Sequence, residues 1–540
     1  MKHDACALFL SVLWFTPAAA AAVTVHAGSV SSVPEAVFFS FDLDTIPFRR
    51  NLELTLVPAH KHPEPVLRRG PKGAFDELRA EYYGSVLRIG GKLRMWYCGY
   101  GFEDPANRTY GGVTAHIGYA ESTDGVHWTK PNLGLVAYHG NKNNNIILIE
   151  PQDYTSTHAD RNIHVLYEPD DPDPQRRYKM MLYAPHDGGR ATMVPLISPD
   201  GLRWRYVHRM EVTDEAKPRF KIASTGMPNE HLEGGGLVRV GGIYYMNGQS
   251  HNRYDGGLIG RFPATYWSSD FIHWQHEKAL SMLRWGYDPR TPISEGREVH
   301  EGVALWNRGN ALVGIYGMWE GAPRWADRRI HLGLVSSVDA IYFREPSPDF
   351  IFAEAGKPGA WDSGGLLQGQ GFENIGDETF IWYGSWDLTA SGGTQVYLDR
   401  DMLESHGDIG VLKLRRDGFG YAAVRDPKTA RPRETFGTGT GSLLTVPFRV
   451  EGSPARVSAN ADTAAGGSLR FELLDTGGTP VRGYTLDDAI PLEKSGVRVP
   501  VRWRKGDELV PGIYRMRVRI DRSGASSPRL YAFYVTSATK

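Results

Sequence analysis

A short motif that recurs five times along the chain places the strongest limit on its fold. The segment Ser122 to Trp128 has the form S-x-D-G-x-x-W, and Ser198 to Trp204 repeats it. Weaker copies contain Asp270, Asp339 and Asp417, so the motif recurs every ~70–80 residues along the chain. An Asp in a turn accepts backbone N–H bonds two residues on, and the aromatic side chain packs between neighbouring units. The motif therefore predicts five equivalent structural units.

Each copy of the motif follows a predicted β-hairpin. The five hairpins span residues 84–100, 164–185, 235–250, 302–319 and 370–386. Most of them have Gly or Asp residues between two apolar runs, which is typical of tight hairpin turns. A hairpin, a third strand and a turn into a fourth strand make one blade of a β-propeller. The sequence therefore predicts an all-β fold with a five-bladed β-propeller.

The C-terminal part of the chain has a different pattern. Residues 426–441 are polar and contain Pro and Gly, as expected of a linker. Beyond them, residues 514–520 alternate between apolar and charged side chains, and residues 497–503 contain the same alternation. This pattern predicts half-buried antiparallel strands. We therefore expect a propeller catalytic domain over residues 23–435 and an antiparallel β-sandwich over residues 436–540.

The first 22 residues have the pattern of a secretory signal peptide. Lys2 precedes an apolar run from Ala7 to Phe15, and the small residues 18–22 offer A-x-A cleavage sites. The run is too short to span a bilayer, although an uncleaved anchor is the alternative interpretation. Cleavage would remove Cys6 and leave Cys98 alone, which excludes an intramolecular disulfide. We expect a periplasmic or extracellular protein without a membrane span.

The composition narrows the class of partner. The 61 Lys and Arg residues balance the 62 Asp and Glu residues, which argues against nucleic acid as the main partner. Aromatic residues make up 11% of the chain, and it contains 62 glycines. This mixture suits short strands, tight turns and a cleft that binds sugars. We therefore expect an oligo- or polysaccharide as the substrate.

Acidic residues precede most of the predicted first strands. In a propeller the first strand of each blade starts at one mouth of the central channel, so residues at the five starts converge. These residues are, in blade order, Glu81, Asp160 to Asn162, Glu233, Glu301 and Gln368. Cleavage of a glycosidic bond needs a carboxylic acid that protonates the leaving oxygen and a carboxylate that attacks the sugar or activates water. A single Glu here is more simply a solvated loop charge. The recurrence at equivalent positions predicts that Glu81, Glu233, Asp160 and Glu301 are catalytic.

Other polar residues near these starts are candidates for substrate binding. They are Arg161, Asn162, His164, His231, His300 and Gln368. Histidines beside acids are also typical of zinc sites, but no H-E-x-x-H motif or other fixed ligand spacing is present. We therefore expect the histidines to bind sugar hydroxyls or tune a pKa, with no metal ligands and no cofactor. The sequence leaves open whether a structural calcium ion occupies the channel.

The five hairpins, the S-x-D-G-x-x-W turns and the trailing sandwich resemble glycoside hydrolases of families 32 and 43, in particular secreted bacterial proteins described as family 32-like. The resemblance implies that Glu81 replaces the family's blade-one Asp as nucleophile or base. It implies that Asn162 replaces the Asp of an R-D-P motif in blade two, with Asp160 compensating, and that Glu233 is the general acid.

The sequence as a whole predicts a glycoside hydrolase, with a furanoside end of a glycan among the expected substrates. One alternative is a sialidase, although sialidases usually have six blades and an arginine triad. A second is a family 130-like glycoside phosphorylase, which would need a basic pocket for phosphate. A third is a propeller that binds sugars without catalysis, since a fold alone does not give a function. Acid-to-amide substitutions in the pocket separate this last class from the enzymes.

Overall fold

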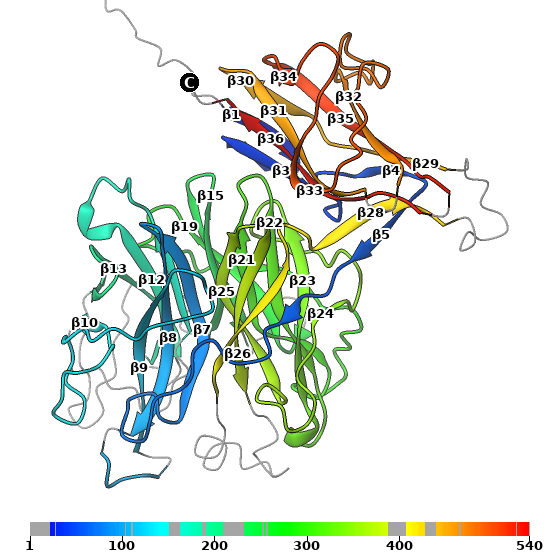
Figure 1. The fold of residues 1–540 in the computed structure, drawn as a ribbon. Helices are drawn as coiled ribbons and strands as arrows, with labels where there is room; N and C mark the ends of the chain where they lie inside the picture. Colours follow the sequence, from blue (N-terminus) through cyan, green and yellow to red (C-terminus); the bar gives the residue numbers. More distant parts are fainter. Residues whose placement is uncertain are drawn as a thin grey trace, which may run out of the picture.

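The computed structural model describes residues 22–27, 29–102, 104–109, 112–150, 162–185, 191–208, 232–250, 253–254, 258–386, 407–426, 439–463, 466–524 and 526–538. Strands make up almost all of the regular structure in these ranges, with short 3₁₀ helices such as η2 (Pro174–Arg176) between them. The predicted all-β fold is confirmed. Figure 1 shows a ring of strands with a second, smaller β-structure at one end. None of the helices in the described ranges is long and apolar enough to cross a membrane.

Five antiparallel units form the ring. The first contains β7 (Arg79–Ile89), β8 (Lys92–Phe102) and β9 (Val113–Ser122). The second contains β11 (Ile163–Tyr167), β12 (Tyr178–Pro185), β13 (Ala191–Ser198) and β14 (Arg203–Tyr206), with β10 (Leu148–Glu150) at its edge. The third contains β15 (Leu232–Val240), β16 (Ile243–Ser250), β19 (Phe262–Ser268) and β20 (Ala279–Leu280). Each unit is one blade of a propeller.

The remaining two blades complete the ring. The fourth contains β21 (Arg297–Asn307), β22 (Leu312–Glu320), β23 (Arg329–Ser337) and β24 (Ile351–Ala353). The fifth contains β25 (Gly365–Ile375), β26 (Glu378–Trp386), β27 (Ile409–Arg415) and β6 (His60–Lys61). A separate short hairpin, β17 (Arg253–Tyr254) with β18 (Leu258–Ile259), belongs to neither blade three nor blade four.

The ring closes through the first and the last strands of the propeller. The five first strands contact one another in the order β7, β11, β15, β21 and β25, and β25 returns to β7. Gln370 and Gly371 of β25 pair in parallel with Ser85 and Val86 of β7. The outer strand of blade five is β6, which comes from residues that precede blade one. Blade five is therefore built from both ends of the propeller segment and closes the ring.

The repeated Asp turn stabilises the blades in the predicted way. Asp124 Oδ1 accepts the N–H groups of Val126 and His127 at 2.9 and 2.8 Å, and Ser122 Oγ accepts that of Gly125 at 2.8 Å. Equivalent bonds form at Asp200, Asp270 and Asp339. Gly125 has a φ of +81°, which a glycine adopts without strain.

The turns also join neighbouring blades. Trp96 of blade one donates its indole N–H to the carbonyl of Gly201 in the blade-two turn at 2.8 Å. Trp382 of blade five donates in the same way to Gly125 of blade one at 2.9 Å. The fifth copy of the motif differs, because the buried Asp417 accepts hydrogen bonds from Tyr534 at 2.7 Å and Arg308 at 3.2 Å. It connects the propeller to the sandwich.

The sandwich contains two sheets around one apolar core. One sheet contains β1 (Ala22–Ala27), β2 (Ser29–Val33), β4 (Phe48–Arg50), β29 (Thr440–Leu444), β30 (Phe448–Glu451), β32 (Ser468–Leu474) and β35 (Gly512–Asp521). The other contains β3 (Glu35–Phe39), β5 (Leu52–Leu56), β28 (Gly420–Val424), β31 (Ala455–Asp462), β33 (Gly496–Pro500), β34 (Glu508–Leu509) and β36 (Arg529–Ser537). Side chains such as Phe38, Met516 and Phe533 fill the space between them.

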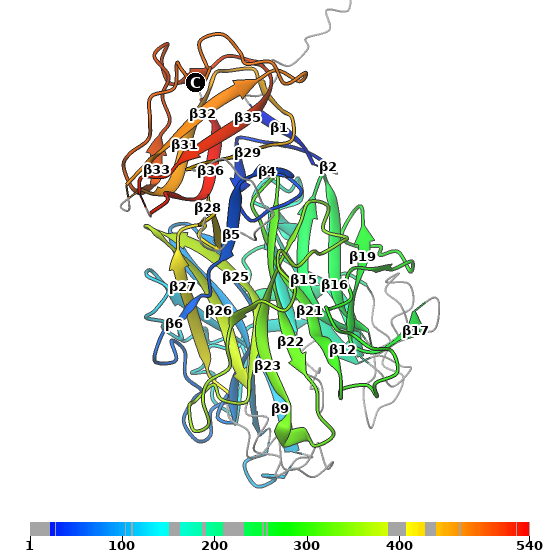
Figure 2. The same cartoon turned by 90° about the vertical axis from the view of Figure 1, so that its right-hand side faces the viewer.

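The strand pairing differs from the expected domain boundaries. We expected residues 23–435 to form the propeller, but β1 to β5 and β28 belong to the two sheets of the sandwich. Figure 2 shows β5 and β28, which pair with each other, at the junction of the two domains. The pairing partners of an alternating strand lie hundreds of residues away, so the local pattern does not reveal them. The predicted signal peptide lies outside the described residues apart from Ala22, which begins β1.

The sandwich lies at the end of the ring at which the first strands finish (Figure 1). Asn310, just after β21, exchanges two hydrogen bonds of 2.8 Å with the backbone of Val37 in β3. The five first strands start at the opposite end. The mouth at which the predicted catalytic residues lie is therefore the one that faces away from the sandwich.

Candidate active site

The first strands are irregular where the predicted site residues lie. Four of them have a β-bulge or register shift, which bends a strand and changes the direction of its side chains. The shifts occur between Glu81 and Ser85, Gly234 and Gly236, His300 and Val303, and Gln368 and Phe372. The same type of distortion occurs at equivalent places in four blades. It indicates that the side chains at the channel mouth share a function.

Glu301 is the most constrained of the predicted acids. It is buried and has a φ of +54°, a left-handed conformation that is uncommon for a residue with a side chain. Gln249 Oε1 accepts its N–H at 3.0 Å. Gln368 Nε2 donates to the carbonyls on both sides of it, to His300 at 2.5 Å and Gly302 at 3.0 Å. Two amide side chains from neighbouring blades thus hold Glu301 in a strained conformation of the kind found at functional sites.

Asn162 connects three blades. Its Nδ2 donates to Glu301 Oε2 at 2.7 Å and to the carbonyl of Gly234 at 2.6 Å. The side chain is completely buried, so its amide acts within the protein rather than at an open surface. An Asp at this position would face Glu301 with a second negative charge, whereas Asn supplies a neutral donor.

Gln249 links two of the predicted catalytic residues. Its Nε2 makes a short hydrogen bond to Oε2 of Glu233, and its Oε1 accepts the N–H of Glu301. Glu233 is half-buried, while Glu81 is buried and lies with Oε2 3.4 Å from Nη1 of Arg79. Through Gln249 the structure thus connects the carboxylate of Glu233 to the backbone of Glu301, and Arg79 gives Glu81 a cationic partner.

His300 lies within an aromatic wall beside Glu301. Its ring stacks on Trp319 with centroids 5.3 Å apart and an angle of 11°, and the ring of Trp386 is 5.8 Å away. Its Nδ1 is 3.3 Å from the hydroxyl of Tyr83 on β7, and its Nε2 is 3.9 Å from Glu301 Oε1. The imidazole of His300, on blade four, thus contacts a side chain of blade one.

His164 is buried in the same region. Burial lowers its pKa to about 4, and a contact with the backbone of Gly234 offsets part of that effect. The imidazole is therefore neutral at neutral pH. The predicted substrate-binding role of His164 stays a prediction.

The glycines after Glu233 allow two first strands to approach each other closely. A Cβ on Gly235 would lie 2.4 Å from the carbonyl oxygen of Glu301. A Cβ on Gly236 would lie 2.3 Å from the carbonyl oxygen of Val303. The glycines thus allow the backbones of blades three and four to touch, which places the two acid-bearing strands side by side.

Three predicted site residues, Asp160, Arg161 and His231, lie outside the described residues, and their roles stay predictions. Among the rest, the structure connects Glu233, Glu301, Asn162, His300 and Gln368 in one network. Glu81 lies at the start of β7, whose Tyr83 contacts His300. Across the described ranges, no group of three or more His, Cys, Asp or Glu side chains is arranged to hold a metal ion.

Sequence reasoning missed two polar residues at this mouth. Glu298 is buried two residues before His300, and burial raises its pKa, although Arg261 at 3.7 Å opposes that shift. Ser294 donates its backbone N–H to Glu298 at 3.0 Å. Gln249 was also missed, although alignment of the hairpin around its Gly241-Gly242 turn places it opposite Glu233.

Comparison with known proteins gives similarity at the level of the fold. No protein-family model matches the chain, and no curated protein matches it. A glycosyl hydrolase from Bacteroides ovatus is 16% identical, with 66% of this chain and 93% of that chain covered and a TM-score of 0.39. The catalytic domain of the Coprinopsis cinerea GH62 α-L-arabinofuranosidase is 12% identical, with 66% and 97% covered and a TM-score of 0.38.

A third structure is an N-acetylgalactosamine deacetylase from F. plautii in complex with blood group B trisaccharide. It is 17% identical, with 67% of this chain and 95% of that chain covered and a TM-score of 0.40. Because these identities and TM-scores are low, the similarities do not assign a reaction to this chain. The resemblance to families 32 and 43 stays a prediction, and the side chains at the channel mouth have to support any proposed function.

Proposed function

We propose that this protein is a glycoside hydrolase whose acid and base are carboxylates at the start of its first strands. The observation that carries the proposal is that Gln249 bonds both the Glu233 carboxylate and the Glu301 backbone N–H, at the mouth of the propeller that faces away from the sandwich. Cleavage of a glycosidic bond requires a carboxylic acid and a carboxylate, and a third acid can bind a sugar hydroxyl. The strained backbone at Glu301 and the bulges beside Glu81, Glu233 and Glu301 favour a functional role for these acids over the alternative of solvated loop charges.

The surroundings of each acid suggest its role. Glu233 is half-buried, so it can reach a bound substrate and protonate the oxygen of the glycosidic bond as that bond breaks. Glu81 has the cation of Arg79 beside it, which suits the carboxylate that attacks the anomeric carbon or takes a proton from the attacking water. Water supplies the oxygen and one hydrogen of the new hemiacetal hydroxyl. Its other proton restores the acid, directly in a retaining reaction or by way of the base and solvent in an inverting one.

Glu301 and His300 complete the site in this proposal. Glu301 accepts a hydrogen bond from Asn162, and its fixed position suits a hydrogen bond to a sugar hydroxyl. The half-buried Trp386 offers a face that a sugar ring can contact, while the buried Trp319 and Tyr83 hold His300 in place. An oligo- or polysaccharide, including one with a furanoside end, is the proposed substrate, and the N-terminal signal pattern supports export to the periplasm or beyond.

Product analysis on a panel of glycans tests the proposal. Arabinan, fructan, xylan, mannan and algal polysaccharides would be incubated with the full chain, with and without inorganic phosphate, and the products separated by chromatography. Release of free sugars that does not depend on phosphate is the expected result. Sugar phosphates formed only with phosphate would instead assign a phosphorylase. Saturable binding of a glycan without any product would assign a non-catalytic binding protein.

A further inference from the structure

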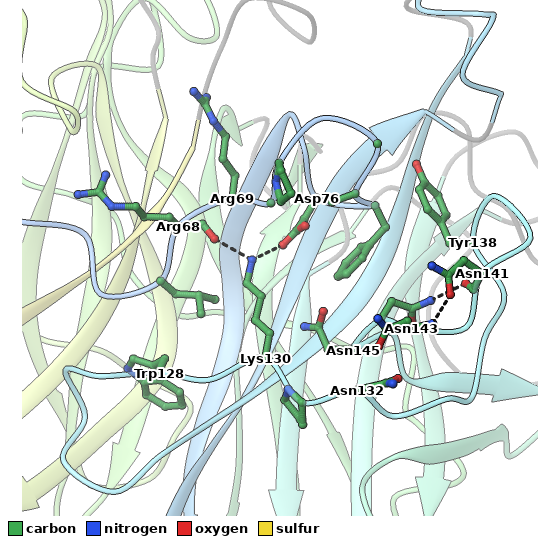
Figure 3. A pocket seen from close by; sticks show the side chains of 18 of the residues that line it. Arg68, Arg69, Asp76, Trp128, Lys130, Asn132, Tyr138, Asn141, Asn143 and Asn145 are labelled. Carbon is green, nitrogen blue, oxygen red and sulfur yellow. Dashed lines mark hydrogen bonds and ion pairs between the residues drawn. The ribbon is translucent and has the colours of Figure 1, made fainter.

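The cations of a cavity beside blade one are held by the protein itself. This cavity has a volume of about 600 Å³ (Figure 3). Lys130 Nζ bonds Asp76 Oδ2 at 2.5 Å and the carbonyl of Arg68 at 2.7 Å. The side chain of Arg68 pairs with Glu64 at 2.6 Å, and Figure 3 shows the Arg69 side chain directed away from the asparagines of the cavity. Positive charge that is not paired in this way lies on the sandwich.

The two sheets of the sandwich differ in what covers them. In the sheet that contains β36, Phe38 and Phe533 point into the sandwich core, while Val37 and Tyr534 pack in one cluster with side chains of the propeller. Both faces of this sheet are therefore covered. The sheet that contains β35 also packs its inner side chains, such as Met516, into the core. The outward side chains of β35, β29 and β4 are half-buried or exposed, so this face is open to solvent.

Five arginines lie on this open face, which we call the arginine face. They are Arg50, Arg470, Arg515, Arg517 and Arg519. Arg470 of β32 lies directly opposite Arg519 of β35. On the other side of Arg519, Ser442 of β29 separates it from Arg50 of β4. The two remaining arginines precede Arg519 at every second position of β35, so they point to the same side of the sheet. Figure 2 shows β32, β35 and β29 in the sandwich.

The acids on the four strands β4, β29, β32 and β35 do not balance these arginines. Glu472 is buried, with Arg517 bonded to it at 2.8 Å. Asp521 lies 2.7 Å from Arg519 and 3.9 Å from Arg470, so one carboxylate serves two guanidinium groups. Five arginines against two acids leave an excess of positive charge, although the chain as a whole has a formal net charge of −1.

Arg50 and Arg515 have no acid within ion-pair distance in the described part of the chain. Arg50 is exposed, and Arg515 donates to the carbonyl of Thr445 at 3.2 Å. The guanidinium of Arg515 lies 5.9 Å from the ring centre of Phe48, which is 54% exposed. Like charges directly opposite each other, as on β32 and β35, destabilise a sheet. A bound anion would relieve this repulsion.

We propose that the arginine face binds an acidic polysaccharide through its carboxylate groups. A guanidinium group can donate two parallel hydrogen bonds to a carboxylate, and Phe48 offers an apolar surface to a sugar ring. A polymer with a carboxylate on each sugar can contact several arginines at once, so that weak contacts combine. The choice of a carbohydrate rests on the proposed function. The sandwich then holds the protein on the polymer, while the channel mouth faces away from the sandwich.

Calorimetric titration of the full chain tests the proposal. The acidic probes are polygalacturonate and alginate, the neutral probe is galactan, and duplex DNA represents a polyanion of another class. The probes are titrated into the unmodified protein and into the double variant Arg50→Gln/Arg515→Gln. The matched control is Arg177→Gln/Arg203→Gln, which removes the same charge from two exposed positions of blade two. Thermal unfolding of each variant shows whether it is folded.

At least one acidic polysaccharide should bind more tightly than galactan, with an affinity that falls as salt is added. Arg50→Gln/Arg515→Gln should weaken this binding about tenfold or more, through loss of charge-assisted hydrogen bonds. The control should change it less than about twofold. The unfolding midpoint of the arginine variant should not fall, because its substitutions relieve repulsion on an open face.

Three results would overturn the proposal. The first is that neither acidic polysaccharide binds more tightly than galactan. The second is that the arginine variant and the control bind alike. The third is that DNA binds to the arginine face and neither acidic polysaccharide does, which would assign a nucleic acid as the partner.

The same variants separate this surface from the proposed function. Hydrolysis of a small chromogenic glycoside should be unchanged in Arg50→Gln/Arg515→Gln, since the arginine face lies on the sandwich. Binding of the acidic polysaccharide should persist in Glu233→Gln. If no glycan is hydrolysed but this binding is observed, the arginine face stands and the proposed function fails. If hydrolysis is observed without binding at the arginine face, the reverse holds.

Discussion

Asn162 of blade two donates its Nδ2 to Oε2 of Glu301 in blade four at a distance of 2.7 Å. The contact joins blades that are not neighbours in the ring, so it lies at the centre of the channel mouth. It also gives Glu301 a neutral donor where an acidic residue would repel it. The relationship has a direct consequence for pH dependence.

Replacement of Asn162 by Asp should move the acidic limb of the pH–rate profile to higher pH. Two carboxylates in contact do not both ionise readily, so the ionised pair would form only at a higher pH than Glu301 alone. Activity near pH 6 should fall about 10- to 100-fold, and part of it should return near pH 8. Asn162→Ala removes the donor without adding charge, so it should lower activity without a comparable displacement of the profile. Equal profiles for both variants would contradict the role of Asn162 as a neutral hydrogen-bond donor to Glu301.

Replacement of Gln249 by Ala should lower kcat more than it raises KM. The variant loses the amide that orients both Glu233 and Glu301, so the loss should appear in the chemical step, by about 10- to 100-fold. The exposed Gln175 on η2 provides a control, and Gln175→Ala should leave both constants unchanged. Steady-state kinetics on a substrate from the glycan panel provide the measurement. An effect confined to KM would mean that Gln249 acts only in substrate binding.

Substitution of Gly235 by Ala should destabilise the protein. The added methyl group would meet the carbonyl of Glu301 at 2.4 Å, and one of the two backbones must move. Overpacking of this kind costs about 1–3 kcal/mol of the free energy of unfolding. Gly477→Ala is a matched control in the sandwich, where the nearest atom to the new Cβ would be 3.4 Å away. Thermal unfolding should show a lower midpoint for Gly235→Ala, and an unchanged midpoint would contradict the close backbone contact.

Stability should fall as the pH falls from about 6.5 toward 4, in part because of His164. Burial lowers the pKa of His164 to about 4, so the unfolded chain binds its proton at a higher pH than the folded protein. Stability from this residue is complete above the unfolded pKa, and about 2 kcal/mol of it is lost at pH 5. His164→Gln removes this titration, so the difference in stability between pH 7 and pH 5 should be smaller in the variant. Urea unfolding at both pH values provides the comparison, and equal differences would contradict a neutral buried His164.

The number of blades could be predicted because its signal is local. Each Asp turn satisfies its own backbone within a few residues, as at Asp124, so the motif is visible in the sequence without knowledge of its partners. The strands β1 to β5 could not be assigned in the same way. Their partners in the sandwich lie up to about 500 residues away, as in the pairing of Glu35 with Thr536, and alternation does not identify a partner.

The position of Glu233 and Glu301 at one mouth of the channel could be predicted from ring geometry, but the contacts of Gln249 and Gln368 with them could not. Glu233 and Glu301 follow from the rule that first strands start at one mouth of the channel. Gln249 and Gln368 support Glu301 only because of the bulge between His300 and Val303, and a bulge of this kind has no reliable signal in one sequence.

The roles of the two carboxylates are tested most directly by the effect of leaving-group acidity on Glu233→Gln. A general acid matters most when the leaving group needs a proton, so the variant should lose at least about 100-fold in kcat/KM on a glycan or an alkyl glycoside. On a dinitrophenyl glycoside of the same sugar it should keep most of its activity, while Glu81→Gln should be inactive on both. If Glu233→Gln loses activity equally on both substrates, Glu233 is not the acid. If both variants keep full activity, the carboxylates at the channel mouth do not carry the reaction.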